Sequence, residues 1–281
     1  MRKKGSPTIW IFIGIAGLCL ALYPLVGSAF STRRDSRKVL QYQQNISEQG
    51  QDVYEAVRRS ARAYNASLAR HLDAELIFQE TGLRYDDTLL SGDSDMIASI
   101  VIPKINVSLP IYHGTGDDVM SRGIGHLEGT SLPIGGVGSH AVLSGHRGLP
   151  DAVLFTNLDL LKIGDYFKIQ VLGDELVYCV DQIRVVEPDD TGELLIDPQK
   201  DLVTLLTCTP YGINSHRLLV RGERVTEEKT ITEQEFRSLG VDPLLSVSLI
   251  TLSLLLGIFV LVVISARRKK QRQADDLQRK I

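Results

Sequence analysis

Uncharged apolar residues fill two long segments near the ends of this 281-residue chain. The first covers about residues 9–30 and the second about residues 244–264, and neither contains Lys, Arg, Asp or Glu. A helix needs about 20 predominantly apolar residues to cross a bilayer. A helix that packs on a protein core keeps a polar face, which both segments lack. We therefore predict two transmembrane helices.

The first apolar segment has a second interpretation. Three basic residues precede it, and residues 27–29 (Gly-Ser-Ala) have the small side chains of a cleavage site, as in a secretory signal peptide. Its apolar run is longer than the roughly 7 to 15 residues of such a signal. This length favours an uncleaved anchor.

Basic residues flank both apolar segments and predict their orientation. Five Lys and Arg residues lie within residues 267–272, directly after the second segment. Because Lys and Arg are retained on the cytoplasmic side, we expect both termini in the cytoplasm and residues 31–243 outside, although a basic cluster at residues 33–38 weakens the signal at the first segment. Residues 39–266 carry 17 Lys and Arg against 31 Asp and Glu, a net charge of −14. Nucleic-acid binding requires a basic face, so it is not expected.

The hydrophobic period changes at Met96. Residues 39–72 repeat apolar positions about every 3.6 residues, which predicts a helical arm that forms a stalk or packs on the main domain. Asp73–Asp95 mixes acids, Gly and Ser, which predicts a loop, and Leu154–Leu161 is a candidate short helix. The predicted strands are Ala98–Ile102, Ser139–Ser144, Tyr166–Leu172, Leu176–Val186, Leu202–Thr207 and Arg217–Val225. They indicate a mainly β domain, either a barrel or a sandwich.

Two of the three cysteines, Cys179 and Cys208, lie between the apolar segments, and Cys19 lies in the first of them. A disulfide between Cys179 and Cys208 is one interpretation, because exported proteins tend to oxidise their thiols. The position of Cys179 inside a predicted strand favours a lone buried thiol instead. No Cys-x-x-Cys pair is present, so a structural zinc site is not expected.

Cys208 stands at the end of a predicted strand, just before Pro210. A thiol in this position is open to a substrate, and its thiolate is a nucleophile when a cation or a base lies beside it. If the strands on either side of the loop Thr209–His216 pair as a hairpin, Arg217 faces Cys208. Arg217 then stabilises the thiolate or an oxyanion. The ordinary alternative is a surface arginine at a strand end.

Among the six histidines, His146 is the best candidate for an acid–base group. It follows an apolar run and lies in residues 144–148 (Ser-Gly-His-Arg-Gly). The flanking glycines allow a substrate backbone to approach closely. For the other histidines we expect ordinary hydrogen-bonded roles.

Together these motifs resemble those of the sortases, the cysteine transpeptidases of Gram-positive bacterial surfaces, over roughly Met96–Val225. Residues 204–208 (Thr-Leu-Leu-Thr-Cys) are similar to the Thr-Leu-x-Thr-Cys signature of the family, and residues 143–146 (Leu-Ser-Gly-His) to its histidine motif. The resemblance implies catalytic roles for His146, Cys208 and Arg217. It also implies a sortase-like eight-stranded β-barrel and acyl transfer without a cofactor or a metal ion.

Further motifs resemble class C, the pilus-assembling sortases. They are residues 102–106 (Ile-Pro-Lys-Ile-Asn), 110–115 (Pro-Ile-Tyr-His-Gly-Thr) and 207–214, together with the second apolar segment. The class implies cleavage of a Leu-Pro-x-Thr-Gly-type sorting signal and transfer to a pilin lysine. The alternatives are a housekeeping sortase that anchors proteins to peptidoglycan, a cysteine hydrolase, and an inactive membrane-held docking module.

One stretch departs from class C. Asp73–Tyr85 contains no proline and so lacks the Asp-Pro-aromatic anchor of the class C lid, which leaves Phe78 or Tyr85 as substitute plugs. The expected organisation is residues 1–30 as cytoplasmic N-terminus and transmembrane anchor (or signal peptide), 31–95 as helical arm and lid-like region, 96–226 as catalytic barrel, 227–243 as linker, 244–264 as transmembrane helix and 265–281 as basic cytoplasmic tail. The implied partners are the lipid bilayer and pilins or other surface proteins that carry sorting signals.

Overall fold

The computed structural model describes residues 33–46, 51–70, 73–90, 95–149 and 152–225, together with Gly14, Gly17, Tyr23, Gly27, Ser31 and Ser253. The chain divides into two compact units, Met1–Leu239 and Gly240–Ile281, and nearly all of the described residues belong to the first. Among these residues, no helix is both long and apolar enough to cross a membrane. Apart from single positions, the predicted transmembrane segments at residues 9–30 and 244–264 lie outside the described residues.

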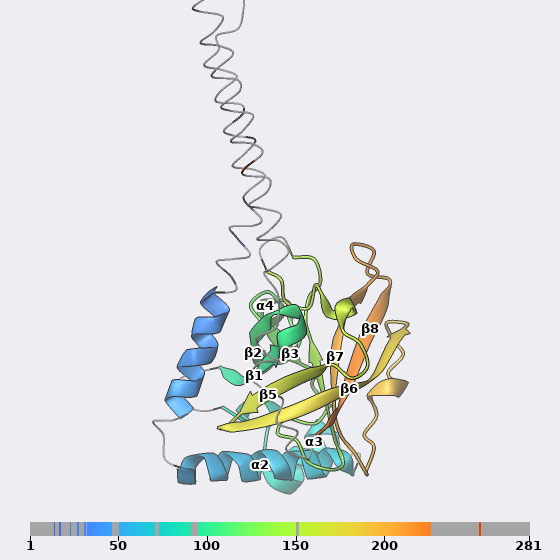
Figure 1. Ribbon diagram of the computed structural model, residues 1–281. Coiled ribbons are helices and arrows are strands. Elements are labelled where there is room, and N and C mark those ends of the chain that lie inside the picture. The colour runs from blue at the N-terminus through green and yellow to red at the C-terminus, as the bar shows by residue number, and fades with distance from the viewer. Residues whose placement is uncertain are drawn as a thin grey trace, which may run out of the picture. The chain divides into compact units, whose positions relative to one another are not determined.

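Within the described part of the chain, eight strands close into a barrel (Figure 1). The order around the barrel is β1-β2-β3-β4-β7-β8-β6-β5. The pairs β2–β3 and β4–β7 are parallel, and the other pairs are antiparallel. The strands are β1 (Met96–Ile102), β2 (Val107–His113), β3 (Ile124–His126), β4 (Ser139–Ser144), β5 (Tyr166–Val171), β6 (Asp174–Val186), β7 (Asp201–Thr209) and β8 (His216–Arg224). The predicted mainly β fold with an eight-stranded barrel is confirmed.

Helices flank the barrel, and Figure 1 shows α2 running across its lower end with α3 beside it. The helices are α2 (Gln51–Ala69), α3 (Ala74–Thr81) and α4 (Asp117–Met120), and the 3-10 helices are η1 (Tyr85–Asp87), η2 (Pro103–Ile105), η3 (Leu158–Leu160) and η4 (Gly192–Leu194). A further helix covers residues 33–46. Where the chain is described, the predicted helical arm is therefore confirmed.

The arm packs on the barrel and does not stand away from it as a stalk. Tyr42, in the helix at residues 33–46, is 2% exposed, and its hydroxyl donates a hydrogen bond to the carbonyl of Ile97 at 3.0 Å. On α2, the amide of Asn65 makes two hydrogen bonds with the backbone of Leu132. A buried polar side chain that satisfies a loop backbone in this way fixes one segment against the other.

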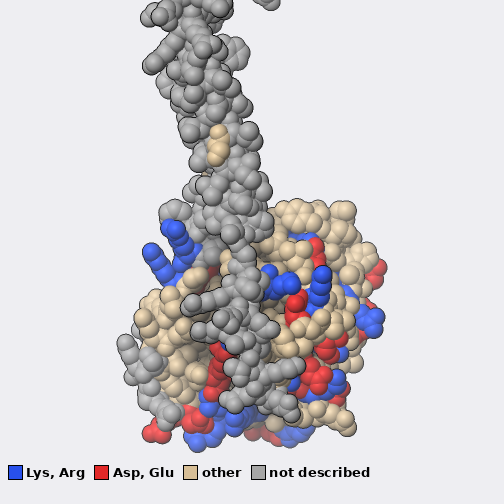
Figure 2. Space-filling view, in the orientation of Figure 1, with Lys and Arg blue, Asp and Glu red and all other residues tan. Residues whose placement is uncertain are grey.

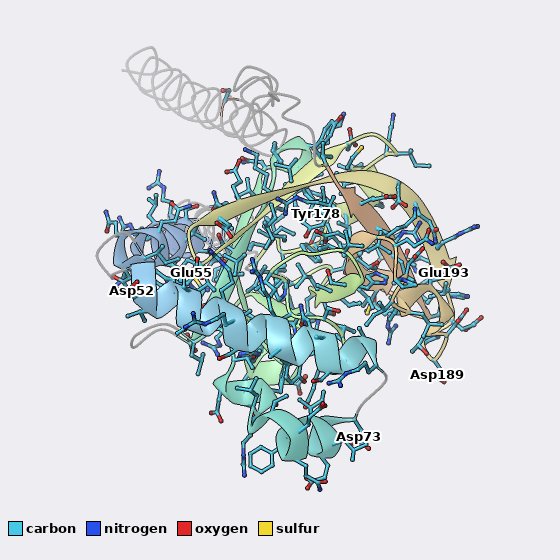
Figure 3. All side chains as sticks on the ribbon, turned by 90° about the horizontal axis from the view of Figure 1, so that it is seen from below. Asp52, Glu55, Asp73, Tyr178, Asp189 and Glu193 are labelled. Atoms are coloured by element: carbon cyan, nitrogen blue, oxygen red, sulfur yellow. The ribbon has the colours of Figure 1, made fainter. Side chains whose placement is uncertain are left out.

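One stacked pair of aromatic rings lies in the barrel interior. The Phe167 and Tyr178 rings lie 5.5 Å apart between centroids, and both side chains are fully buried. Figure 3 shows Tyr178 inside the ring of strands. Its hydroxyl donates to the carboxylate of Asp201 at 3.0 Å, which satisfies a polar group that would otherwise be costly to bury.

Two strands, β2 and β3, were not predicted from the hydrophobic pattern. Pro110 interrupts β2, because proline has no N–H for the sheet ladder. The structure tolerates it because β3 begins to pair only opposite Ile111, so Pro110 has no β3 residue to bond. With three residues, β3 is too short to show a period.

The stretch Asp73–Asp95 is not simply a loop, because it contains α3 and η1. Asp73 caps the start of α3 by accepting a hydrogen bond from the Leu76 N–H, and Gly82 ends the helix with a left-handed φ of 71°. These are the preferred residues for the two caps of a helix. The acid and the glycine that indicated a loop are thus the boundaries of a short helix. The candidate helix at Leu154–Leu161 is confirmed only as the single 3-10 turn η3.

Candidate active site

The predicted nucleophile lies on the outer face of the barrel. Val203 and Leu205 of β7 belong to the hydrophobic core. Because side chains alternate between the faces of a strand, Leu206 and Cys208 point to the other side. Cys208 is half-buried there. It is the last residue but one of β7, so its thiol lies where the strand meets a loop.

Arg217 faces Cys208 across a hairpin. β7 and β8 pair antiparallel, and Cys208 is directly opposite Arg217 in the register. Directly opposite residues of an antiparallel pair project to the same face, with Cβ atoms about 5 Å apart. The predicted hairpin, and the predicted facing of these two residues, are confirmed. The guanidinium donates to the carbonyls of Asn214 and His216 at 3.4 and 3.2 Å, which orients it at the mouth of the loop.

His146 lies on the neighbouring strand path. β4 runs parallel to β7 with Ser144 opposite Leu206, and the Gly145 N–H extends the ladder by donating to the Leu206 carbonyl at 3.0 Å. Continuing this register by two residues sets His146 level with Cys208. Neighbouring strands lie about 4.8 Å apart. His146 and Arg217 thus belong to the two strand paths that neighbour β7, one on each side of Cys208.

The glycine before His146 is required for packing. A Cβ atom added at Gly145 would lie 2.7 Å from Cδ1 of Ile124 and 2.7 Å from Cδ2 of Phe155, closer than real Cβ contacts. The hydroxyl of Thr207 also donates to the Gly145 carbonyl at 2.7 Å. Both contacts hold the backbone before His146 tightly against β7. The sequence-based argument, that the glycine leaves room for a substrate, missed this packing role.

The other described histidines have hydrogen-bonded roles, as predicted. His113, His126 and His140 each bond a backbone carbonyl, those of Thr88, Ser131 and Leu195 respectively. His216 is the first residue of β8 and lies 3.3 Å from the carboxylate of Glu187. His71 lies outside the described residues.

His140 ties the connection between β6 and β7 to the strand that carries Cys208. Its Nδ1 donates to the Leu195 carbonyl at 2.9 Å, and its Nε2 accepts from the hydroxyl of Thr204 at 2.7 Å. Burial lowers the pKa of His140, so the neutral imidazole that this pattern requires is favoured. The connection, marked by Asp189 and Glu193 in Figure 3, is thereby tied at Leu195 to the outer face of β4 and β7.

Neither aromatic candidate for a plug covers Cys208. Tyr85 is buried, and its hydroxyl accepts the Gly114 N–H at 3.0 Å and lies 2.8 Å from Nδ1 of His126. Phe78 of α3 is 39% exposed, and the Arg84 guanidinium lies over its ring. Tyr85 is not available as a substitute plug, because its ring belongs to the core and the thiol lies on the outer face.

The two cysteines that the structure describes are both free thiols. Cys179 pairs with Glu223 and Cys208 with Arg217, six residues apart along β8, which corresponds to about 20 Å. A disulfide cannot span that separation. We expected Cys179 to be a buried core residue, and this is wrong. Cys179 is half-buried, because its neighbours Tyr178 and Val180 take the inward positions.

Five residues around the site were not predicted from the sequence. Arg147 contacts Asp159 at 2.6 Å and Thr209 at 3.3 Å, and its guanidinium lies over the ring of Tyr211. Arg147 directly follows His146, and Thr209 directly follows Cys208. This adjacency was the only sign in the sequence that these two residues belong to the site. The loop between β7 and β8 adds the exposed side chains of Tyr211 and Ile213. Figure 2 shows a largely uncharged surface at the upper right, where Figure 1 places the loop between β7 and β8. Acidic and basic side chains alternate along the lower edge, where α2 lies.

No cluster of three or more His, Cys, Asp and Glu side chains suited to a metal ion occurs in the described ranges. The arrangement instead offers a thiol, an imidazole and a guanidinium on three neighbouring strand paths. These groups can perform nucleophilic attack on a carbonyl, proton transfer and stabilisation of an oxyanion.

Comparisons with known proteins agree with this chemistry. The family model for the sortase domain matches residues 100–225. The solved structure of the sortase C1 of GBS Pilus Island 1 is 43% identical, with a TM-score of 0.64, and the match covers 70% of this chain and 96% of that chain. The structure of Clostridium perfringens sortase C with the C-terminal cell wall sorting motif is 42% identical, with a TM-score of 0.60, and the match covers 68% of this chain and 100% of that chain.

Among curated relatives, Sortase D of Bacillus subtilis is 34% identical over 128 residues, which are 44% of this chain and 62% of the relative. The match therefore spans less than two thirds of that relative. The two solved sortases are matched over nearly their whole length at 42–43% identity, and the barrel carries the candidate nucleophile at a strand end. On these grounds the chain belongs to the sortase family of cysteine transpeptidases.

Proposed function

We propose that this sortase cleaves a Leu-Pro-x-Thr-Gly-type sorting signal and joins the acyl fragment to a lysine of a pilin subunit. Cys208 is the nucleophile, His146 is the acid–base group, and Arg217 stabilises the oxyanion or orients the peptide. The observation that carries the proposal is the register of β4, β7 and β8, which supports a common location for the three groups on the outer face of the barrel.

The first half of the reaction forms a thioester. The thiolate of Cys208, paired with a protonated His146, attacks the carbonyl carbon of the Thr–Gly bond, and the carbonyl oxygen gains the negative charge of a tetrahedral intermediate. The guanidinium of Arg217, which is always protonated, donates hydrogen bonds to that oxygen. When the intermediate collapses, the C–N bond breaks, and His146 gives a proton to the leaving amine of glycine.

The second half transfers the acyl group. The amine of the acceptor lysine attacks the thioester carbon, the C–S bond breaks, and an isopeptide bond replaces it. A lysine amine has a reference pKa of about 10.4, so it must lose a proton before it attacks near neutral pH. His146, now neutral, accepts that proton and returns to the form in which the cycle began.

Several features support a pilus-assembling enzyme over a housekeeping sortase. The motifs at residues 102–106, 110–115 and 207–214 resemble class C, and the sortase C structures are 42–43% identical to this chain. The relatives named Sortase A, from Streptococcus agalactiae and Bacillus anthracis, are 25% and 31% identical. Pilins and other surface proteins with sorting signals are the proposed substrates.

We also propose that the barrel works outside the cytoplasmic membrane. The apolar segments at residues 9–30 and 244–264 would anchor it in the bilayer, with both termini in the cytoplasm. This arrangement suits a family that acts on proteins during their attachment to the cell surface. A reporter fused after Ile281 would report a cytoplasmic location if the proposed orientation is correct.

The pilin lysine is the sharpest test of the proposed substrate. Full-length enzyme in detergent, mixed with subunits that carry a sorting signal and an acceptor lysine, is expected to form a ladder of covalently linked subunits on a denaturing gel. Replacing the acceptor lysine with arginine should collapse the ladder to monomer and hydrolysed product, because arginine stays protonated and cannot attack. If the enzyme joins sorting peptides only to peptidoglycan-type amines and never to pilin, the housekeeping alternative is correct.

A further inference from the structure

Arg147 is a buried cation behind the candidate catalytic residues. Only 9% of its side chain is exposed, whereas its partner Asp159, on η3, is 46% exposed. The Nη2 atom lies 2.6 Å from the Asp159 carboxylate, and Nη1 donates to the Thr209 hydroxyl at 3.3 Å. The buried Nε–H has no acceptor among the described residues. A charged group held with one donor unsatisfied is costly, and such groups need an explanation.

The guanidinium lies on the opposite side of β7 from the thiol. Cys208 and Thr209 are consecutive residues of a strand, so their side chains point to opposite faces. Because Arg147 reaches the side chain of Thr209, it approaches β7 from the face opposite to the Cys208 side chain. This placement separates Arg147 from the reacting atoms and assigns it a structural contact behind them.

The segment after His146 is closely packed around this contact. The Gly148 N–H donates to the Thr156 hydroxyl at 3.0 Å, and the His146 carbonyl accepts from the Phe155 N–H at 3.1 Å. A Cβ atom added at Gly148 would lie 3.0 Å from the ring of Tyr211, which also lies over Arg147. The two hydrogen bonds fix the backbone on both sides of Arg147.

We propose that Arg147 is a positioning residue for the transfer reaction. Arg147 directly follows His146, and its guanidinium contacts the hydroxyl of Thr209, which directly follows Cys208. The Asp159 carboxylate holds the guanidinium in place. The distance between imidazole and thiol therefore depends on an ion pair that touches neither of them. This inference rests on the proposed roles of Cys208 and His146.

Asp159→Asn is the variant that tests the proposal, because it removes the charge of a half-exposed side chain without changing its size. We expect kcat for acyl transfer to fall roughly tenfold or more, with KM for the sorting peptide unchanged, since small displacements of catalytic groups reduce turnover strongly. Arg147→Lys should have a similar effect, because an ammonium cannot contact Asp159 and Thr209 with a fixed fork. The kcat of the double variant should be no lower than that of the less active single variant, because both changes break the same contact.

Glu175→Gln is the matched control. Glu175 on β6 is 47% exposed and pairs with Lys168 on β5, which is 19% exposed. The control should keep the wild-type kcat. Measurements are made on full-length enzyme in detergent, well below the unfolding midpoint of each variant, so that a loss of stability alone would leave kcat unchanged.

Three results would overturn the positioning role. They are an unchanged kcat in Asp159→Asn, a rise in KM without a change in kcat, and additive losses in the double variant. Failure of the proposed function has a different signature, namely wild-type transfer by Cys208→Ala. If Cys208→Ala is inactive while Asp159→Asn turns over normally, the proposed function stands and the role of Arg147 is wrong.

Discussion

Cys208→Ala is expected to abolish transpeptidation, whereas Cys179→Ala keeps most of it. The thioester requires a thiol on the outer face of β7, and Cys208 is the residue in that position. Cys179 is half-buried on β6, opposite Glu223 and about 20 Å along β8 from Arg217. Its replacement should cost about 1 kcal/mol of stability at most.

Both variants can be assayed with a quenched sorting peptide and a small amine acceptor, alongside thermal unfolding of the same preparations. Equal unfolding midpoints with opposite activities would support the assignment. If Cys179→Ala alone removed activity while the fold stayed intact, the nucleophile would be Cys179 and the proposed site would be wrong.

Arg217→Ala is expected to lower kcat by roughly 10²- to 10³-fold, the usual effect of removing one donor from an oxyanion site. Its register position opposite Cys208 supports a guanidinium close to the attacked carbonyl. Arg217→Lys should recover only part of the loss, because lysine keeps the charge but lacks the planar fork of donors. A fall in kcat with little change in KM indicates an interaction made in the transition state.

Arg59→Ala provides the matched control, because Arg59 is an exposed arginine on α2. Single-turnover measurements of thioester formation should show the Arg217 defect already in the first half of the reaction. If Arg217→Ala formed the thioester at the wild-type rate, Arg217 would have no role in stabilising the first oxyanion.

The hairpin that joins Cys208 to Arg217 was predictable from the sequence. Two predicted strands are separated by a loop that contains Pro210 and Gly212, and such a pattern indicates both the turn and the approximate register. The facing of Cys208 and Arg217 follows from that register. The place of His146 next to β7 could not be predicted in this way, because it depends on a parallel pairing of β4 and β7 that no local pattern reveals.

Other features were hidden because their signals point two ways. Pro110 ordinarily excludes a strand interior, yet β2 accommodates it before β3 begins. Asp73 and Gly82 are common in loops and equally common as helix caps, so α3 was missed. Arg147 was not singled out in the sequence, and only the long-range contacts with Asp159 and Thr209 distinguish it.

The segment that was considered as a lid belongs to the body of the protein. Ile77, Tyr85 and Leu89 are buried in the main core cluster, so this stretch contributes to the barrel's packing. Burial lowers the pKa of His126, which meets the Tyr85 hydroxyl, to about 4. The neutral imidazole therefore persists across the physiological pH range, and the contact stays intact.

The most direct test of the central claim is the site of the acyl group on the enzyme. Full-length protein is incubated with a Leu-Pro-x-Thr-Gly peptide in the absence of an amine acceptor, quenched with acid, digested and examined by mass spectrometry. The mass of the acyl fragment ending in threonine is expected on the peptide that contains Cys208, and hydroxylamine should release it, as it does other thioesters. An acyl group on Cys179, or active transfer with no acyl group on Cys208, would contradict the proposed mechanism.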